Sequence, residues 1–344
     1  MNDANGKTVL VTGGSGYLAG WMIQALLKQG YDVRASIRRP EAGDTLLNKI
    51  EKSGVAPDRL TFKTIDLLSD VGWDDAVDGC EAIMHVASPM GQGQGKKVDL
   101  VTPAREGTLR VLRAAQQRSV KRVVMTSSGF AAQGDDVTKR LVGVEAEAVW
   151  ADSARKDMSN YARSKVLAER AAWDFMKAEG RNFSLTSILP GLILGPLFGD
   201  EATGSLEVVK RMLSGAMPAI PRIGFGIVDV RDLVDLHVKA MLSSSAAGQR
   251  FLGISDFLWL SEIAAALKTA LGEEAAKVPT RMMPDFVLRL AALFQEDAKF
   301  MAPMLGKKSS LDSRKAIEQL NWHPRPVAET VIDCARSLVI SRHR

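Results

Sequence analysis

Residues 7–20, KTVLVTGGSGYLAG, carry the strongest fold signal in this chain of 344 residues. Their β-branched start, KTVLVT, predicts a short buried strand, and residues 17–30 follow with the periodicity of a helix. Gly13 and Gly16 stand where the strand turns into the helix, and Ala19 completes the spacing G-x-x-G-x-x-A. Such a turn brings backbone and a helix N-terminus close to a phosphate, so it is typical of dinucleotide binding. A turn with a purely structural role is the alternative.

Strands and helices alternate from this turn to Pro190. Further strands are expected at Tyr31–Ile37, Arg59–Ile65, Ala82–Ala87, Arg122–Thr126 and Asn182–Leu189, and long helices at Val98–Ser119 and Asp157–Gly180. Strands that alternate with helices at this spacing form parallel sheets through right-handed crossovers. The pattern therefore predicts an α/β protein with a doubly wound, parallel-sheet Rossmann fold.

The alternation breaks after Pro190. Glycines and prolines punctuate residues 190–226, which predicts a loop-rich segment, and helices return from Asp229. We expect two domains: an NADP-binding Rossmann domain from 1–189 plus 227–256, and a smaller, mostly helical C-terminal substrate lobe from 190–226 plus 257–344.

Composition and charge exclude several classes of protein. The chain is 46% hydrophobic and 25% charged, which is ordinary for a globular protein and excludes a disordered one. The net charge of +5 comes from scattered basic residues, so we expect no nucleic-acid partner. No apolar stretch is long enough to span a bilayer and no apolar signal region opens the chain, so no membrane partner is expected. Cys80 and Cys334 lie far apart, which suits a reducing compartment, and we expect a cytoplasmic location.

The end of the second expected strand indicates which dinucleotide binds. A carboxylate there binds the ribose 2′-hydroxyl of NAD, whereas an arginine pairs with the 2′-phosphate of NADP. Arg38 and Arg39 stand at this end, and no acidic residue precedes Glu41. Arginine grips a phosphate with two charge-assisted hydrogen bonds, so NADP(H) is the expected cofactor, with two solvated surface arginines as the alternative. Asp66 and Leu67 follow the third strand as candidate adenine contacts, and a plain turn is the alternative for Asp66.

A serine, a tyrosine and a lysine form the candidate catalytic set. Ser127 and Ser128 close the fifth strand, whose carboxyl end faces the cofactor crevice in such a sheet. Tyr161 and Lys165 share one face of the next helix at i and i+4. Reduction of a carbonyl needs a proton on its oxygen, and an ammonium from Lys165 would lower the phenol pKa toward the useful range. Ser128 would hydrogen-bond the carbonyl oxygen, while strand-end hydrogen bonding is the expected role of one of the two serines.

Other side-chain chemistry is not indicated. The four histidines and two cysteines show no metal-ligand spacing, so no metal site is expected. His85 ends the fourth strand beside the expected cofactor, and a buried histidine with satisfied hydrogen bonds is the preferred interpretation.

The order of these motifs resembles the extended short-chain dehydrogenase/reductase superfamily. The matching motifs are TGxxGxxA, Arg38, HVASP at His85–Pro89, TSS, YxxSK and LPGLILGP at Leu189–Pro196. Within it, the chain is similar nearly end to end to the dihydroflavonol-4-reductase-like group, which includes cinnamoyl-CoA reductases and fungal aldehyde/ketone reductases. The resemblance implies catalysis by Ser128, Tyr161 and Lys165. The residues expected to bind the cofactor are Thr12, Gly13, Ser15, Gly16, Tyr17, Leu18, Arg38, Asp66, Leu67, Val86, Ala87, Ser88, Tyr161, Lys165, Pro190, Gly191 and Leu192.

Two departures from the family pattern limit what the resemblance implies. Ala19 replaces the usual third glycine, which is a tolerated change. Gly129-Phe130 replaces the usual small residues after the serine pair, and residues 130–140 would line the substrate pocket, so the family's substrates are not carried over. An apolar pocket wall is expected from Met90, the Gly91–Gly95 loop, Phe130, Leu192, Phe225 and Phe286, unless these side chains pack between the lobes.

The sequence predicts an NADPH-dependent carbonyl reductase or alcohol dehydrogenase that acts on a bulky or aromatic small molecule, as a monomer or homodimer. Its first alternative is an NAD-dependent nucleotide-sugar epimerase or dehydratase, although dehydratases resemble Thr-Asp-Glu where Ser128-Gly129-Phe130 stands here. A non-enzymatic NADP-binding sensor is the second alternative, although such proteins typically lose the catalytic tyrosine or lysine.

Overall fold

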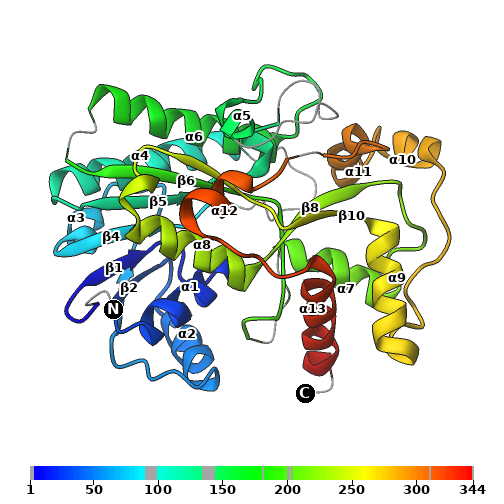
Figure 1. Ribbon diagram of the computed structural model, residues 1–344, viewed down its shortest axis with the longest axis horizontal. Helices are drawn as coiled ribbons and strands as arrows, with labels where there is room; N and C mark the ends of the chain where they lie inside the picture. The colour runs from blue at the N-terminus through cyan, green and yellow to red at the C-terminus, as the bar shows by residue number, and fades with distance from the viewer. Residues whose placement is uncertain are drawn as a thin grey trace. The chain divides into compact units, whose positions relative to one another are not determined.

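A seven-stranded sheet carries the predicted glycine turn (Figure 1). The structure is a computed structural model, which describes residues 4–89, 99–133, 144–179, 182–199, 202, 204–309 and 311–342. Its strands are β1 (Thr8–Val11), β2 (Asp32–Ile37), β3 (Leu60–Thr64), β4 (Cys80–His85), β5 (Arg122–Thr126), β6 (Ser184–Pro190) and β9 (Arg250–Gly253). They lie in the order β3-β2-β1-β4-β5-β6-β9, and the pairs from β3 through to β6 are parallel. The strand order reverses between β1 and β4, where ligands bind in doubly wound folds.

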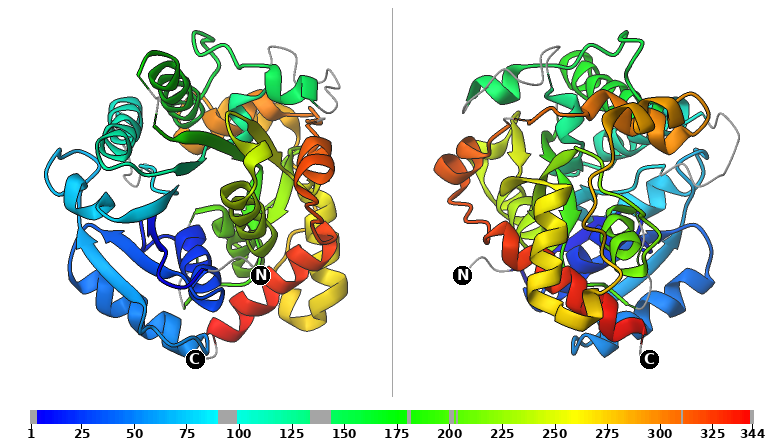
Figure 2. Two further views of the ribbon diagram at one scale, coloured as in Figure 1. Left: turned by 60° about the vertical axis from the view of Figure 1, so that its left-hand side comes forward. Right: turned by 90° about the vertical axis from the view of Figure 1, so that its right-hand side faces the viewer.

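Helices cover both faces of this sheet, which confirms the predicted fold class. Figures 1 and 2 show α1 (Tyr17–Lys28) and α2 (Glu41–Lys52) on one face, opposite α4 (Val101–Gln117) and α6 (Asn160–Ala178). A large core cluster joins α4, α6 and the short α3 (Trp73–Val77) to the strands beneath them, with Leu10, Ile83 and Leu185 fully buried. Every strand predicted before Pro190 is present, and its ends lie within about two residues of the predicted ones, the usual precision of a boundary.

The chain divides into two compact units. The first contains Met1–Ala131, Asn160–Leu189 and Val234–Phe251, and the second contains Ala132–Ser159, Pro190–Leu233 and Leu252–Arg344. This division differs from the expected domains at residues 132–159, 227–233 and 252–256, which group with the second unit. One reason is a buried hydrogen bond, in which the backbone N–H of Leu252 donates to the carboxylate of Glu147 at 3.1 Å.

The second unit contains a small sheet as well as helices. Its strands β7 (Leu192–Leu194), β8 (Gly224–Asp229) and β10 (Asp256–Trp259) lie in the order β10-β8-β7. The sequence pattern predicted only a loop here, because Gly224 and Gly226 interrupt the apolar alternation of β8. Glycine is needed at Gly224, since a side chain there would overlap the ring of Phe257 on the paired strand.

Helices make up most of the rest of the second unit. They are α5 (Val144–Ala148), η2 (Gly204–Leu206), α7 (Glu207–Ser214), α9 (Leu260–Leu271), η4 (Gly272–Ala275), α10 (Asp285–Ala291), α11 (Glu296–Met301), η5 (Ala302–Met304), α12 (Arg314–Leu320) and α13 (Val327–Arg342). Figure 2 shows α9 beside α13. One helix, α8 (Val230–Leu242), begins in this unit and ends in the first, where η3 (Ser244–Ala246) follows it.

Three observations concern membranes, metals and thiols. Within the described residues, no helix is both long and apolar enough to cross a membrane. The same residues contain no group of three or more His, Cys, Asp or Glu side chains placed to hold a metal ion. Cys80 and Cys334 are buried free thiols.

Candidate active site

The glycine turn between β1 and α1 is held tightly against two neighbouring strands. Gly13 has a φ of +72°, which favours glycine, and its N–H donates to Ser36 Oγ at 2.9 Å. The N–H of Gly14 donates to the Ser36 carbonyl at 2.7 Å. A Cβ on Gly13 would lie 3.0 Å from the Cβ of Ala87, and one on Gly14 would lie 3.0 Å from the Cβ of Ala35. The turn therefore favours glycine at both positions, most strongly at Gly13, where the positive φ adds to the close contact.

The N-terminus of α1 has the properties of a phosphate site. Gly16 caps the helix without a side chain, and the first turn contains no acidic residue. Ser15 and Gly16 are exposed, whereas Leu18 is buried and offers a ligand only its backbone. An uncapped helix N-terminus carries partial positive charge, so the residues here fit the pyrophosphate of a dinucleotide.

Thr12 connects the ends of β1 and β4. Its hydroxyl accepts hydrogen bonds from the N–H groups of Val86 at 3.1 Å and Ala87 at 3.0 Å, and its own hydrogen is left for His85 Nδ1 at 3.0 Å. His85 Nε2 then donates to Thr108 Oγ1 at 3.3 Å. Burial, assisted by the charge of Lys165, lowers the pKa of His85 to about 3. His85 is a neutral, hydrogen-bonded histidine, as its sequence context indicated.

The expected ribose and adenine contacts follow β2 and β3. Arg38 is exposed and comes directly after β2, the strand whose Ser36 binds the glycine turn. Asp66 follows β3, and its Oδ1 accepts the N–H of Leu68 at 2.9 Å, which is the turn interaction considered as the alternative. The carbonyl of Leu67 accepts from Arg110 at 2.8 Å. The residues after β2 and those after β3 lie at the carboxyl edge of the sheet, where the cofactor contacts are predicted.

The two serines after β5 have different surroundings. Ser127 donates to the buried carboxylate of Glu169 at 2.6 Å, so the structural role expected for one serine belongs to Ser127. Ser128 is 7% exposed, and its Oγ accepts the N–H of Phe130 at 3.3 Å. Because Oγ accepts this bond, its own hydrogen can be donated to a substrate oxygen.

Tyr161 and Lys165 lie in the first two turns of α6, close to the end of β5. The ring of Phe130 packs edge-on against Tyr161 at 6.4 Å between centroids. Lys165 Nζ donates to the Thr126 carbonyl at 3.4 Å. Burial raises the pKa of Tyr161 to about 12 and lowers the pKa of Lys165 to about 8, against the opposing charge of Glu169.

The raised pKa of Tyr161 differs from the expectation that Lys165 lowers the pKa of this phenol. Removal from water penalises the charged form of each group, so it raises the pKa of a phenol and lowers the pKa of an ammonium. In this structure desolvation dominates for both. Tyr161 is consequently held in its protonated form near neutral pH.

Other predicted site residues lie in the second unit or outside the described residues. Pro190, Gly191 and Leu192 belong to the second unit, where a side chain at Gly191 would overlap the Gly226 carbonyl. Ser88 is half-buried after β4. The expected pocket residues 90–95, and 134–140 of the segment that begins at Phe130, lie outside the described residues.

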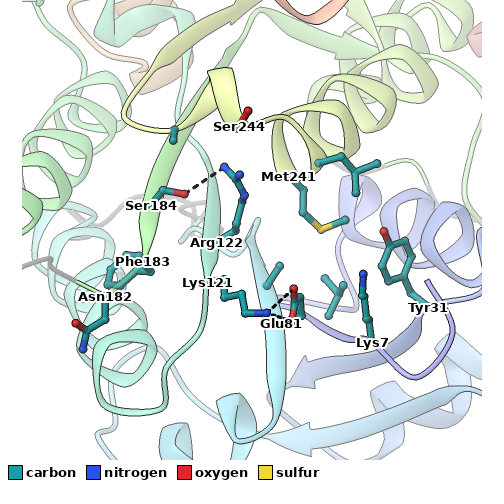
Figure 3. Close-up of a pocket in the computed structure, with 14 residues that line it drawn as sticks. Lys7, Tyr31, Glu81, Lys121, Arg122, Asn182, Phe183, Ser184, Met241 and Ser244 are labelled. Atoms are coloured by element: carbon teal, nitrogen blue, oxygen red, sulfur yellow. Dashed lines mark hydrogen bonds and ion pairs between the residues drawn. The ribbon is translucent and has the colours of Figure 1, made fainter. Parts of the chain in front are cut away.

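A pocket of about 600 Å³ opens at the opposite, amino ends of the strands (Figure 3). Lys121 and Glu81 form an ion pair at 3.1 Å in it, and Arg122 donates to Ser184. None of the predicted site residues lines it. The lining residues are Lys7, Val9, Tyr31, Glu81, Ala82, Lys121, Arg122, Asn182, Phe183, Ser184, Met241, Leu242, Ser244 and Ala247.

Residues 9–252 match the model of the NAD dependent epimerase/dehydratase family. The chain belongs to this family. Among its relatives, cinnamoyl-CoA reductase CAD2 of Medicago truncatula is 35% identical over 258 residues, covering 73% of this chain and 78% of the relative. Dihydroflavonol 4-reductase of Gerbera hybrida is 30% identical over 279 residues, covering 78% of this chain and 74% of the relative.

The fold is also similar to that of solved structures. Yeast methylglyoxal/isovaleraldehyde reductase Gre2, solved with NADPH, superposes with a TM-score of 0.80 at 22% identity, over 98% of this chain and 99% of that one. The predicted membership of the extended short-chain dehydrogenase/reductase family is confirmed, and with it the assignment of the chain as an oxidoreductase.

Three residues that support the site were not predicted. They are Ser36, which holds the glycine turn, and the ion pair of Glu169 and Arg250 behind Ser127. The position of Glu169, four residues after Lys165 on the same helix face, was a signal available in the sequence. No local pattern indicated Arg250, which is 81 residues from Glu169 along the chain.

Proposed function

We propose that this protein is an NADPH-dependent carbonyl reductase that acts on a bulky or aromatic aldehyde or ketone, with Tyr161 as the general acid. The observation that carries the proposal is the linked set at the end of β5, in which Phe130 contacts both Ser128 and Tyr161 and Lys165 binds the Thr126 carbonyl. The named relatives are reductases of carbonyl compounds, which supports the same chemistry here.

The glycine turn and the residues after β2 would hold the cofactor. Thr12, Gly13, Ser15 and Gly16 would contact the pyrophosphate, because they form the tight turn and the uncapped start of α1. Arg38 would pair with the 2′-phosphate. NADPH, when bound, supplies the hydride that reduces the carbonyl carbon.

The side chains at the end of β5 would bind and protonate the carbonyl oxygen. Tyr161, protonated at neutral pH, gives its proton to the oxygen as negative charge develops there. Ser128 donates a second hydrogen bond to the same oxygen and stabilises that charge. Protonated Lys165 makes the local potential more positive, which favours transfer of the phenol proton. The apolar ring of Phe130 beside Tyr161 is consistent with an aromatic or bulky substrate.

NADPH consumption against a panel of substrates tests this function. We expect turnover of aromatic aldehydes, ketones or cinnamoyl thioesters, no turnover of nucleotide sugars, and preference for NADPH over NADH. Conversion of a nucleotide sugar without net cofactor consumption would instead identify an epimerase. Tight NADPH binding without turnover of any carbonyl, together with full retention of that binding in Lys165→Met, would support the sensor alternative.

A further inference from the structure

A buried carboxylate joins four polar side chains directly behind the candidate catalytic set. Glu169 lies one helical turn after Lys165 on α6, and its side chain is fully buried. Its Oε2 accepts from Ser127 at 2.6 Å, and its Oε1 accepts from Ser187 at 2.5 Å and from Trp173 at 3.3 Å. The carboxylate therefore connects α6 to the ends of β5 and β6.

Arg250 on β9 completes this cluster. Its Nε donates to Glu169 Oε1 at 2.8 Å, and one terminal nitrogen donates to Oε2 at 3.2 Å and to the Ala131 carbonyl at 3.3 Å. Ala131 ends the short helix η1 (Gly129–Ala131), which also contains Phe130. Arg250 thus binds both the carboxylate and the segment that packs against Tyr161.

Stability alone does not account for such a pair. A buried ion pair is often no more stabilising than well-packed apolar side chains of similar volume, because both charges lose their hydration. A buried charge network does fix the positions of the groups that it binds. Here those groups are Ser127, adjacent to Ser128, and the helix that carries Lys165.

We propose that Glu169, held by Arg250, is a positioning residue for carbonyl reduction: it fixes the end of β5 through Ser127 and places a negative charge one helical turn from Lys165. This inference rests on the proposed function. Ser187 binds the same carboxylate from β6 but is not adjacent to a reacting side chain, so it supplies a matched comparison.

The charges around Lys165 define the electrostatic part of the proposal. Tyr161 and Glu169 lie on its own helix, and His85 lies on β4. His237 on α8 is hydrogen-bonded to Thr126 at 2.8 Å, beside the carbonyl that Lys165 binds. Arg250 contributes a positive charge from β9. Of these, Glu169 raises the pKa of Lys165, against the lowering by burial.

The first experiment compares Ser127→Ala with Ser187→Ala. Each removes one buried hydroxyl that donates to Glu169, so the two variants should unfold at similar denaturant concentrations. Ser127→Ala should lower kcat by about 10- to 100-fold with an unchanged KM for NADPH, because the end of β5 loses its anchor. Ser187→Ala should retain kcat within about twofold. Equal losses of kcat in the two variants would show a merely structural network and overturn the proposal.

The second experiment titrates Lys165 in the protein without cofactor, by NMR of its lysine side chains, with Lys165→Met identifying the signal. Glu169→Gln should lower the midpoint below the wild-type value of about 8, because the negative charge is lost. Lys165 would then lose its proton at a lower pH than in the wild type. The fall of kcat with rising pH would accordingly begin at a lower pH. An unchanged titration midpoint of Lys165 in Glu169→Gln would overturn the proposed electrostatic role of Glu169.

The two experiments separate this inference from the proposed function. The titration needs no carbonyl substrate, so absence of reductase activity in the wild type would reject the function while the titration still tests Glu169. If Glu169→Gln does not fold, the comparison of Ser127→Ala and Ser187→Ala decides the proposal.

Discussion

Tyr161 and Lys165 show how burial sets the protonation of the candidate site. Desolvation favours the neutral form of each group, which is the acid form of tyrosine and the basic form of lysine. At neutral pH the pKa of about 12 keeps Tyr161 protonated, and the pKa of about 8 leaves most of Lys165 charged. Since Lys165 loses its charge as pH rises through about 8, carbonyl reduction should weaken on the alkaline side.

Removal of the Tyr161 hydroxyl tests the proton donor. Tyr161→Phe should lower the rate of carbonyl reduction by about 10²- to 10⁴-fold, the usual contribution of a general acid. NADPH affinity and the unfolding midpoint should be retained, because the ring still packs against Phe130. Tyr31→Phe is the matched control, since Tyr31 is a buried tyrosine at the amino ends of the strands. Near-normal turnover in Tyr161→Phe would remove the proposed mechanism.

Arg38 should decide the choice between the two nicotinamide cofactors. One charge-assisted bidentate contact contributes about 1.5–3 kcal/mol, which corresponds to roughly a 10- to 150-fold preference for NADPH. Arg38→Ala should weaken NADPH binding by about that factor and leave NADH binding unchanged, because NADH has no 2′-phosphate. Dissociation constants for both cofactors check this, and Arg39→Ala tests the neighbouring arginine. Equal wild-type affinity for the two cofactors would refute the role of Arg38.

At the scale of elements, the β1–α1 turn depends on neighbouring strands as much as on its own glycines. Ser36 of β2 binds the turn through both its side chain and its carbonyl, and a Cβ on Gly13 would lie only 3.0 Å from the Cβ of Ala87 after β4. The turn conformation is therefore a property of three adjacent strand ends. A change there should affect cofactor binding more than a comparable change at another glycine.

Gly13→Ala and Gly54→Ala form a pair that tests this point. Their φ angles are similar, +72° and +77°, so each alanine should cost about 1–2 kcal/mol of backbone strain. Only at Gly13 would the new Cβ meet other atoms, since Gly54 has open space within 4 Å. Gly13→Ala should therefore lose much of its NADPH affinity, whereas Gly54→Ala should retain it. Urea unfolding and NADPH titration measure the two effects, and equal cofactor affinities would contradict the expectation.

At the scale of the molecule, long-range ion pairs join distant parts of the second unit. The fully buried Asp229 carboxylate binds Arg231 at 2.8 Å, and Arg231 also binds Asp333 of α13 at 2.7 Å. Arg325 binds Asp232 at 2.9 Å and lies 3.7 Å from Asp229. The end of β8 and the start of α8 are thereby tied to the C-terminal helix and the segment before it.

Loss of the Asp229 carboxylate should destabilise this unit. Asp229→Ala should lower the free energy of unfolding by about 3 kcal/mol, the lower end for breaking a buried pair, because the arginines remain partly exposed. Asp235→Ala, which removes a partly exposed i, i+4 pair with Lys239, should change it by about 0.5 kcal/mol or less. Denaturant unfolding followed by intrinsic fluorescence compares the two. Similar changes in both variants would mean that the Asp229 network contributes nothing beyond a surface pair.

Features with a local physical cause could be predicted from the sequence. Strand and helix periodicity, the glycine turn and the order of Ser128, Tyr161 and Lys165 all lie within short stretches, so β1 to β6 and the family were predictable. Only the packing of elements shows that Ser127 binds a buried carboxylate, because that carboxylate lies on another element. The same packing sets the burial on which the pKa of Tyr161 depends, and it brings together Glu169 and Arg250, which lie 81 residues apart. Such contacts depend on how elements pack in space, and neither periodicity nor spacing along the chain contains that information.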